Sequence, residues 1–218
     1  MASKPLVPSH LMTPTTRIFG FLILFFLAGC ECKTEPPWVD LDPEKWKPLN
    51  FGGEGAAAWT DGVLHLDAGA ELTGAVFEGE LPEIPYEIEL EARKVTGSDF
   101  FCGLTFPVRS EEECVTLIVG GWGGGTIGIS SIDGQDASAN ETTTYGNFET
   151  GRWYAIRVKV GEEGIEAFID GERVVDLAIA GKELGLRQGV IELCAPLGFA
   201  AWQTESEVRG LRWRSLRD

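Results

Sequence analysis

The stretch PYEIELEARKV, residues 85–95, decides the fold class of this 218-residue chain. Its side chains alternate with a period of two: the apolar ones are Tyr86, Ile88, Leu90 and Ala92, and the charged ones are Glu87, Glu89, Glu91 and Arg93. This period is typical of a β-strand with one buried face and one face in water. Residues 152–160 repeat the pattern, with Tyr154 at the start of their apolar face.

Turn signals divide the rest of the chain into short runs of the same kind. The pairs Asp61-Gly62 and Asp170-Gly171 each follow an apolar run and predict tight β-hairpins. Further strands are expected at 72–78, 100–108, 114–120, 126–131, 189–194, 198–204 and 208–216. In total we expect about eleven to thirteen strands, with one short helical turn at 182–188. Regular strands with turn signals predict an all-β sandwich or jelly roll of two antiparallel sheets.

The charge balance excludes one class of partner. The chain has 34 acidic and 18 basic residues, a net charge of −16. Two of the basic residues, Lys4 and Arg17, precede Cys30 and no acidic residue does, so 16 basic residues face 34 acidic ones after it. Such a surface repels phosphate backbones, so no nucleic-acid partner is expected.

The first thirty residues resemble an export signal. Residues 18–27 (IFGFLILFFL) are apolar and follow Arg17. A membrane-spanning helix needs about 20 apolar residues, so this run has the length of a signal-peptide core. The next residues, 27–30 (LAGC), are similar to the cleavage site of bacterial lipoproteins, in which the cysteine, here Cys30, is lipidated. The alternative is an ordinary secretory signal followed by an unrelated cysteine.

This signal predicts the organisation and location of the chain. We expect a lipoprotein signal peptide over 1–29, a lipid-anchored tether over 30–45 and a jelly-roll domain over 46–218. Two lipid chains at Cys30 would suffice for stable membrane anchoring. The expected location is therefore extracytoplasmic, on the membrane of a bacterial cell envelope.

Four cysteines remain after Cys30, namely Cys32, Cys102, Cys114 and Cys194. An oxidising compartment permits disulfides, and four cysteines allow three pairings. Cys102 and Cys114 lie on consecutive expected strands, which makes them the first candidate pair. Buried free thiols are the alternative, and no spacing matches a zinc site.

Three segments carry a resemblance to known proteins. They are WYAIRVKV at 153–160, IEAFIDGERVVD at 165–176 and VRGLRW at 208–213. They resemble the concanavalin A-like jelly rolls and, together with Asp61-Gly62-Val63-Leu64, more narrowly the 3-keto-disaccharide hydrolase family. The resemblance implies a hydrolase that acts on glycosides, in a family many of whose members are bacterial lipoproteins. The family's Asn-Ser-Gly segment corresponds to Phe101–Leu104, where only Gly103 matches, so no catalytic residue is carried over.

Few residues could perform acid–base chemistry. His65 is the single histidine after Cys30, and no nucleophile-elbow motif is present, so neither a paired-histidine metal site nor a typical serine triad is expected. The string EIELE, residues 87–91, is similar to the catalytic strand of laminarinase-type glucanases, whose carboxylates flank the scissile bond. The alternative is a solvated strand face whose acids pair with cations on neighbouring strands, such as Arg157, Lys159, Arg212 and Arg214.

The segment 119–148 is the most unusual part of the chain. Trp122 stands among five glycines, which suits an exposed aromatic face that stacks on a sugar ring. The polar loop 132–144 follows, with side chains that could bind hydroxyl groups or Ca²⁺. The candidate substrate-binding residues are therefore Trp122, Asp133, Asp136, Asn140, Glu141 and Thr142.

Each of these candidates has a structural alternative. Trp122 could belong to the core, and the loop could satisfy its own polar groups through Asx and Ser/Thr hydrogen bonds. Trp202 could be a second stacking platform or a core residue. The EF-hand pattern is absent, so no cofactor or metal is expected, with Ca²⁺ as the one open alternative.

Three functions stay open at this stage. The first is a membrane-anchored hydrolase of the 3-keto-disaccharide type, and the second is a non-catalytic protein that binds carbohydrate. The third is an interaction module of the cell envelope. Carbohydrate is the partner that we favour, while catalysis is undecided.

Overall fold

The computed structural model describes Met1, residues 35–53 and residues 55–217. The predicted signal peptide, its lipidation site Cys30 and the neighbouring Cys32 lie outside these residues, so the predictions made for them are untested. All statements about structure below concern the described part of the chain.

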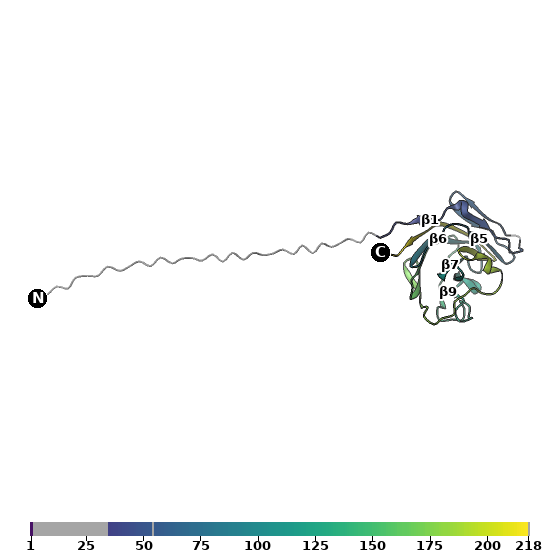
Figure 1. Ribbon diagram of the computed structural model, residues 1–218. Helices are drawn as coiled ribbons and strands as arrows, with labels where there is room; N and C mark the ends of the chain where they lie inside the picture. The colour runs from purple at the N-terminus through teal and green to yellow at the C-terminus, as the bar shows by residue number, and fades with distance from the viewer. Residues whose placement is uncertain (2–34, 54, 218) are drawn as a thin grey trace. The chain divides into compact units, whose positions relative to one another are not determined.

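Fifteen strands form two antiparallel sheets in the described residues, seen as two layers in Figure 1. The eight-stranded sheet has the order β13-β12-β11-β6-β15-β4-β3, with β1 beside β15. Its strands are β1 (Val39–Asp40), β3 (Ala57–Thr60), β4 (Val63–Leu66), β6 (Tyr86–Gly97), β11 (Tyr154–Val160), β12 (Gly164–Ile169), β13 (Glu172–Ala178) and β15 (Thr204–Ser215). The predicted all-β class is confirmed.

The seven-stranded sheet has the order β10-β9-β8-β7-β14-β5-β2. Its strands are β2 (Trp46–Pro48), β5 (Leu72–Phe77), β7 (Cys102–Ser110), β8 (Glu113–Gly120), β9 (Thr126–Ser130), β10 (Thr144–Tyr145) and β14 (Gly198–Trp202). Outside the sheets lie the 3₁₀ helices η1 (Pro43–Lys45) and η2 (Val190–Cys194) and a single turn, α1 (Gly121–Gly124).

The core lies between the two sheets, and β6 supplies one of its central rows. The apolar residues of β6 that the period of two predicted to be inward are all at most 3 % exposed. Each large side chain buried in this way contributes about 1.5–3 kcal/mol. The Tyr86 hydroxyl donates a hydrogen bond of 2.5 Å to the carbonyl of Pro107 on β7, which joins the two sheets through the core.

Both predicted Asp-Gly hairpins are present, between β3 and β4 and between β12 and β13. Asp61 and Gly62 have φ of 52° and 77°, and Asp170 and Gly171 have φ of 51° and 83°. Two successive positive φ angles define the turn whose twist matches that of the flanking strands. The two Asp-Gly pairs, which are visible in the sequence, thus set how β3 pairs with β4 and how β12 pairs with β13.

Two local predictions are wrong. Residues 189–194 were expected to form a strand, but Val190–Cys194 is the 3₁₀ helix η2. Its buried residues, Ile191 and Cys194, are three positions apart, which is the repeat of a 3₁₀ turn and not of a strand. The expected helical turn at 182–188 is irregular chain, held by side-chain contacts that are described below.

The first candidate disulfide is also wrong, because Cys102, Cys114 and Cys194 are buried free thiols. Cys102 lies opposite Val119 and Cys114 lies opposite Pro107 in the β7–β8 ladder. The two cysteines therefore occupy opposite ends of this hairpin, five residues or roughly 17 Å apart along β8, whereas a disulfide needs Cα atoms within about 7 Å.

The sandwich begins inside the segment that was predicted as a tether. Val39 and Asp40 pair with Trp213 and Arg212 of β15, and Leu41 is 3 % exposed within the core. In the part of the chain that the structure describes, no helix has the length and apolar character needed to cross a bilayer.

Candidate functional site

A groove of about 550 Å³ opens on the outer face of the seven-stranded sheet. Along β8, Val115, Leu117 and Val119 point into the main core, whereas Thr116 and Ile118 point to this groove. The groove is lined by Glu71, Leu72, Asp99, Phe100, Thr116, Ile118, Trp122, Ser130, Arg187, Gln188, Gly189, Val190, Ile191 and Trp202. Its volume is in the range of ordinary ligand sites, about 300–1,000 Å³.

A second, smaller apolar cluster forms the base of the groove. Leu72, Phe100, Ile118 and Ile191 belong to it, and Trp202 packs against it. The cluster is outside the main core and covers the outer face of the sheet. It gives the groove an apolar floor between polar rims.

Trp122 stands at the rim of the groove on the turn α1, and 43 % of its surface is exposed. Its backbone, with φ of 48° and ψ of 56°, is in the left-handed region, as are those of Gly120, Gly123 and Gly124. A side chain in this region costs roughly 1–2 kcal/mol, whereas glycine adopts it freely. The flanking glycines thus let the chain turn sharply and present the indole to solvent, and the alternative of a core Trp122 is wrong.

Asp99 fixes the turn that carries Trp122. Its Oδ2 accepts a hydrogen bond of 3.2 Å from the backbone N–H of Gly123, and its Oδ1 accepts one of 2.8 Å from Phe100. The hydroxyl of Thr204 accepts from the Asp99 N–H and donates to the Asp99 carbonyl. These bonds connect the turn to the start of β15, so the position of the indole is set by the sheet.

Trp202 lines the groove from the end of β14 and is half-buried. Trp202 packs on the outer apolar cluster and also lines the groove, so it is not a residue of the main core, and its role as a stacking platform stays a prediction. Trp202 pairs with Leu72 of β5, which brings the preceding residue, Glu71, to the same groove.

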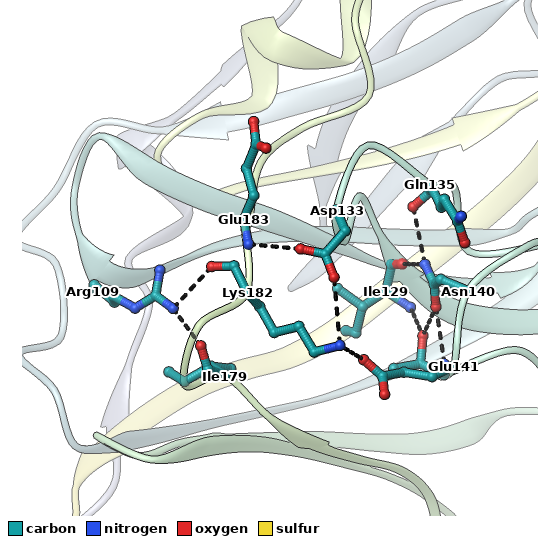
Figure 2. Close-up of polar contacts among 10 residues, drawn as sticks. Arg109, Ile129, Asp133, Gln135, Asn140, Glu141, Ile179, Lys182 and Glu183 are labelled. Atoms are coloured by element: carbon teal, nitrogen blue, oxygen red, sulfur yellow. Dashed lines mark hydrogen bonds and ion pairs between the residues drawn. The ribbon is translucent and has the colours of Figure 1, made fainter.

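Asn140 and Thr142 hold the loop 132–144 together, and neither lines the groove. Figure 2 shows the contacts of Asn140. The Nδ2 of Asn140 donates to the carbonyls of Ile129, Gln135 and Asp136 at 2.7–3.0 Å. Its Oδ1 accepts from the N–H and the hydroxyl of Thr142, and that hydroxyl accepts from the N–H of Ile129. The alternative of a self-satisfied loop is therefore correct for these two residues.

Asp133 and Glu141 both contact Lys182 and are likewise absent from the groove lining (Figure 2). The Nζ of Lys182 is 3.4 Å from Oδ2 of Asp133 and 2.6 Å from Oε1 of Glu141. The backbone N–H of Glu183 donates to Asp133 Oδ1 at 2.9 Å. That bond and the ammonium lower the pKa of Asp133, and the hydrogen bond to Glu141 raises the pKa of Lys182.

Arg109 secures the same segment from the other side. Its Nη2 donates to the carbonyls of Ile179 at 2.6 Å and Lys182 at 3.3 Å. The segment that begins at Lys182 continues into residues 187–191, which form one wall of the groove. Asp133 and Glu141, predicted to bind substrate, therefore contact the segment that leads into this wall.

Asp136 contacts two residues of the groove without lining it. Its Oδ1 accepts a hydrogen bond of 3.2 Å from the Ser130 hydroxyl, and its Oδ2 is 3.3 Å from Nη1 of Arg187. Of the six residues predicted to bind substrate, only Trp122 lines the groove. Asp136 contacts two residues that line the groove, Ser130 and Arg187. The other four make contacts within the loop or with Lys182.

Sequence reasoning missed most of the polar residues of the groove, namely Glu71, Asp99, Arg187 and Gln188. No local motif marks them, because they meet through the pairing of β14 with β5 and through the path of residues 182–191. No group of three His, Cys, Asp or Glu side chains within the described ranges is arranged to hold a metal ion.

The outer face of the eight-stranded sheet is different, because its acidic residues are paired. Glu87 contacts Arg214, Glu89 contacts Arg212, and Glu91 accepts from Arg209 at 2.8 Å. These contacts, with Arg157 3.9 Å from Glu87, confirm that the acids of this strand face pair with cations. The face is not wholly solvated as expected, because Glu87 is completely buried. A hollow of about 560 Å³ on this face is lined by Glu89 and Glu91, by Arg212, the partner of Glu89, and by Arg157.

His65 also belongs to this charged face. Its Nδ1 is 3.2 Å from Oε1 of Glu207, and 44 % of its side chain is exposed. It is remote from the groove lining and has the surroundings of an ordinary strand-face residue.

No known family model matches the chain, and no curated protein matches it. Solved structures share its fold. The VIP36 exoplasmic/lumenal domain in its Ca²⁺/Man2-bound form is 9 % identical and has a TM-score of 0.56, with 83 % of this chain and 88 % of that one covered. Crh5 transglycosylase, solved in complex with NAG, is 11 % identical with a TM-score of 0.54, and the coverage is 84 % and 85 %.

A third structure, from Parabacteroides distasonis, is described as a candidate glycosyl hydrolase. It is 13 % identical with a TM-score of 0.50, and 83 % of this chain and 94 % of that one are covered. At these identities the likeness is one of fold. The predicted jelly-roll sandwich is thereby confirmed, and the fold is one that carbohydrate-bound proteins also have.

Proposed function

We propose that this protein binds carbohydrate in the groove between Trp122 and Trp202. The observation that carries the proposal is an exposed indole and a half-buried one that line the same groove above an apolar floor. Aromatic rings supply a large flat contact at little entropic cost, and a sugar ring has an apolar face that fits it. Structures of the same fold that are described as bound to mannose or NAG support this choice.

The polar rim completes such a site. Glu71 and Gln188 offer carboxylate and amide groups at the edge of the apolar floor. A few polar groups around an apolar surface are the usual composition of a ligand site, where they fix orientation and specificity. Sugar hydroxyls, at the edges of an apolar ring face, match this distribution.

A glycan array followed by calorimetry tests the proposal. We expect Trp122→Ala to weaken binding of the best glycan about tenfold or more, since loss of an aromatic contact that covers a sugar ring costs about 1.4 kcal/mol or more. Tyr145→Ala is the matched control, because Tyr145 is an exposed aromatic residue that does not line the groove. Unchanged affinity in Trp122→Ala, or an equal loss in both variants, would contradict the proposal.

A hydrolase is the second candidate function. The resemblance to the 3-keto-disaccharide hydrolases motivates it, and Glu71 and Asp99 add two carboxylates to one groove. Glycoside hydrolysis commonly uses such a pair, one as acid and the other as base or nucleophile. Incubation with 3-keto-glycosides should release 3-keto-glucose, and Glu71→Gln should abolish the release while Glu172→Gln on β13 does not. Binding without turnover on a broad panel would reject the hydrolase and leave the binding function.

The proposal also includes a membrane anchor at Cys30 in a bacterial envelope. The residues 27–30, which resemble a lipoprotein cleavage site, motivate it. In cell fractionation, Cys30→Ser should move the protein from the membrane to the soluble fraction, and Cys32→Ser should leave it at the membrane. Retention of the Cys30→Ser protein at the membrane would reject the lipid anchor.

A further inference from the structure

The charges of the groove are unbalanced towards the negative. Glu71 is exposed, and within residues 35–53 and 55–217 its carboxylate makes no hydrogen bond or ion pair. Asp99 adds a second carboxylate, whose oxygens accept hydrogen bonds from uncharged backbone groups. Of the lining residues in the described chain, Arg187 alone is basic, and Asp136 lies 3.3 Å from its guanidinium.

This arrangement separates ligands by charge. A uronic acid or a sulfated sugar would bring a further negative charge towards Glu71 and Asp99 and would be repelled. A neutral sugar would cover the carboxylate of Glu71 without offering it a cation. A protonated amine on the sugar would pair with Glu71, and cations are also attracted to indole faces such as those of Trp122 and Trp202.

We infer that the groove takes glycans that carry a free, protonated amine, with Glu71 as the residue that determines this specificity. The inference rests on the proposed function, because it names the class of sugar that the same groove binds. It requires no rearrangement of the groove, since the Glu71 carboxylate is exposed and unpaired in the described structure.

The test compares two ligands that differ only in acetylation. We use the β-1,4-linked glucosamine trimer and its fully N-acetylated counterpart, titrated into the full-length protein at about pH 5.5, where the amines are protonated. The amine trimer should bind about tenfold more tightly than the acetylated one at low salt. This advantage should shrink severalfold at about 0.5 M salt, because an exposed ion pair is screened.

Glu71→Gln should reduce the advantage of the amine trimer to less than about threefold, mainly by weakening the binding of the amine trimer, which alone offers a cation to this carboxylate. The matched control is Glu172→Gln, which removes the same charge from an exposed position on β13, outside the groove lining. It should preserve the full advantage. The salt dependence of the amine trimer's advantage is measured on the unaltered protein, so it tests the inference even if a variant fails to fold.

The outcomes separate this inference from the proposed function. If the acetylated trimer binds as tightly as the amine trimer, or if the advantage survives Glu71→Gln, the inference is overturned. If neither trimer binds but another glycan binds in a Trp122-dependent way, the inference is overturned while the proposed function stands. Absence of all glycan binding overturns both.

Discussion

At the scale of single residues, Arg214 connects three groups on the outer face of the eight-stranded sheet. Its guanidinium contacts the carboxylates of Glu87 and Glu35 and lies 4.6 Å from the ring centre of Trp38. Glu87 is completely buried, so its charge depends on nearby cations for compensation. A buried carboxylate that loses its partner is far more costly than a surface pair that is broken.

We therefore expect Arg214→Met to lower the free energy of unfolding by about 3 kcal/mol. Adding Glu87→Gln should restore most of this loss, because the uncompensated charge disappears. Arg173→Met is the control: Arg173 contacts Glu166 and Asp176 at an exposed site, where the effect should stay below about 1 kcal/mol. Urea unfolding measures all four proteins, and equal losses in the two arginine variants would contradict the argument.

The buried thiols predict a dependence on alkaline pH. Burial raises the pKa of Cys114 to about 11 and that of Cys194 to about 12, from an ordinary value of 9.0. A raised pKa in the folded state means that the stabilisation is fully present below pH 9 and is lost as the pH rises towards 11 and 12. Urea unfolding should therefore show stability falling above pH 9, and less steeply in Cys114→Ala.

The same thiols should resist alkylation in the folded protein. At about pH 8, iodoacetamide followed by peptide mapping should leave Cys102, Cys114 and Cys194 unlabelled, because the reactive thiolate is scarce in each of them. Labelling should become complete in urea. Rapid labelling of any of the three without denaturant would contradict the buried, protonated state.

At the scale of elements, the segment that leads into the wall of the groove is held by both backbone and side-chain contacts. Gly185 exchanges backbone hydrogen bonds with Ser131, Arg109 donates to the carbonyl of Lys182, and Asp136 contacts Arg187. Lys182 does not line the groove and precedes the wall, residues 187–191, by five positions. Its removal should therefore affect the shape of the site more than the stability of the sandwich.

We expect Lys182→Met to weaken glycan binding severalfold and to change the free energy of unfolding by less than about 1 kcal/mol, as for other exposed ion pairs. Lys159→Met on β11 is the control. Lys159 lies over the ring of Phe168, and both residues belong to the eight-stranded sheet, which does not hold the groove. Calorimetry and urea unfolding give the two quantities. Unchanged affinity in Lys182→Met would show that the wall keeps its position without this contact.

What the sequence could predict follows from the range of the interactions involved. The alternation in β6 and the Asp-Gly turns are local, and both were predicted correctly. The glycines around Trp122 also predicted its exposure, because a left-handed turn is encoded within a few residues. Glu71 and Arg187 were out of reach, since they join the groove through strand pairing and through a segment without periodicity.

The position of the polar loop 132–144 outside the groove lining could not be predicted for a related reason. Its side chains are of the types that bind sugars, but the same types also cap turns and satisfy backbone groups. Asn140 makes five hydrogen bonds within the loop and its neighbourhood, which leaves it little capacity for a ligand. Composition alone does not distinguish the two uses.

At the scale of the whole sandwich, the two outer faces have different tasks. The face of the eight-stranded sheet carries paired arginines and glutamates, and the face of the seven-stranded sheet holds the groove with the two indoles. The core between them keeps the faces apart. Sites that are well separated and share no contacts usually contribute additively to stability.

A bound glycan should therefore stabilise the folded protein independently of the charged face. At a ligand concentration of 100 times Kd, the free energy of unfolding should rise by about 2.7 kcal/mol. Arg214→Met should show the same increase, measured at its own Kd, although its starting stability is lower. Trp122→Ala, at the concentration used for the unaltered protein, should show a smaller increase. A different increment in Arg214→Met would reveal coupling between the faces.

The left-handed backbone of Trp122 has a consequence for how this molecule could evolve. Glycine would relieve the conformational strain at this position. The free energy of unfolding of Trp122→Gly should therefore exceed that of Trp122→Ala by about 1 kcal/mol, as measured by urea unfolding. A lineage selected only for heat resistance would drift towards glycine here and lose the indole. If related chains keep tryptophan at this strained left-handed position, selection for ligand binding, and not for stability, maintains it.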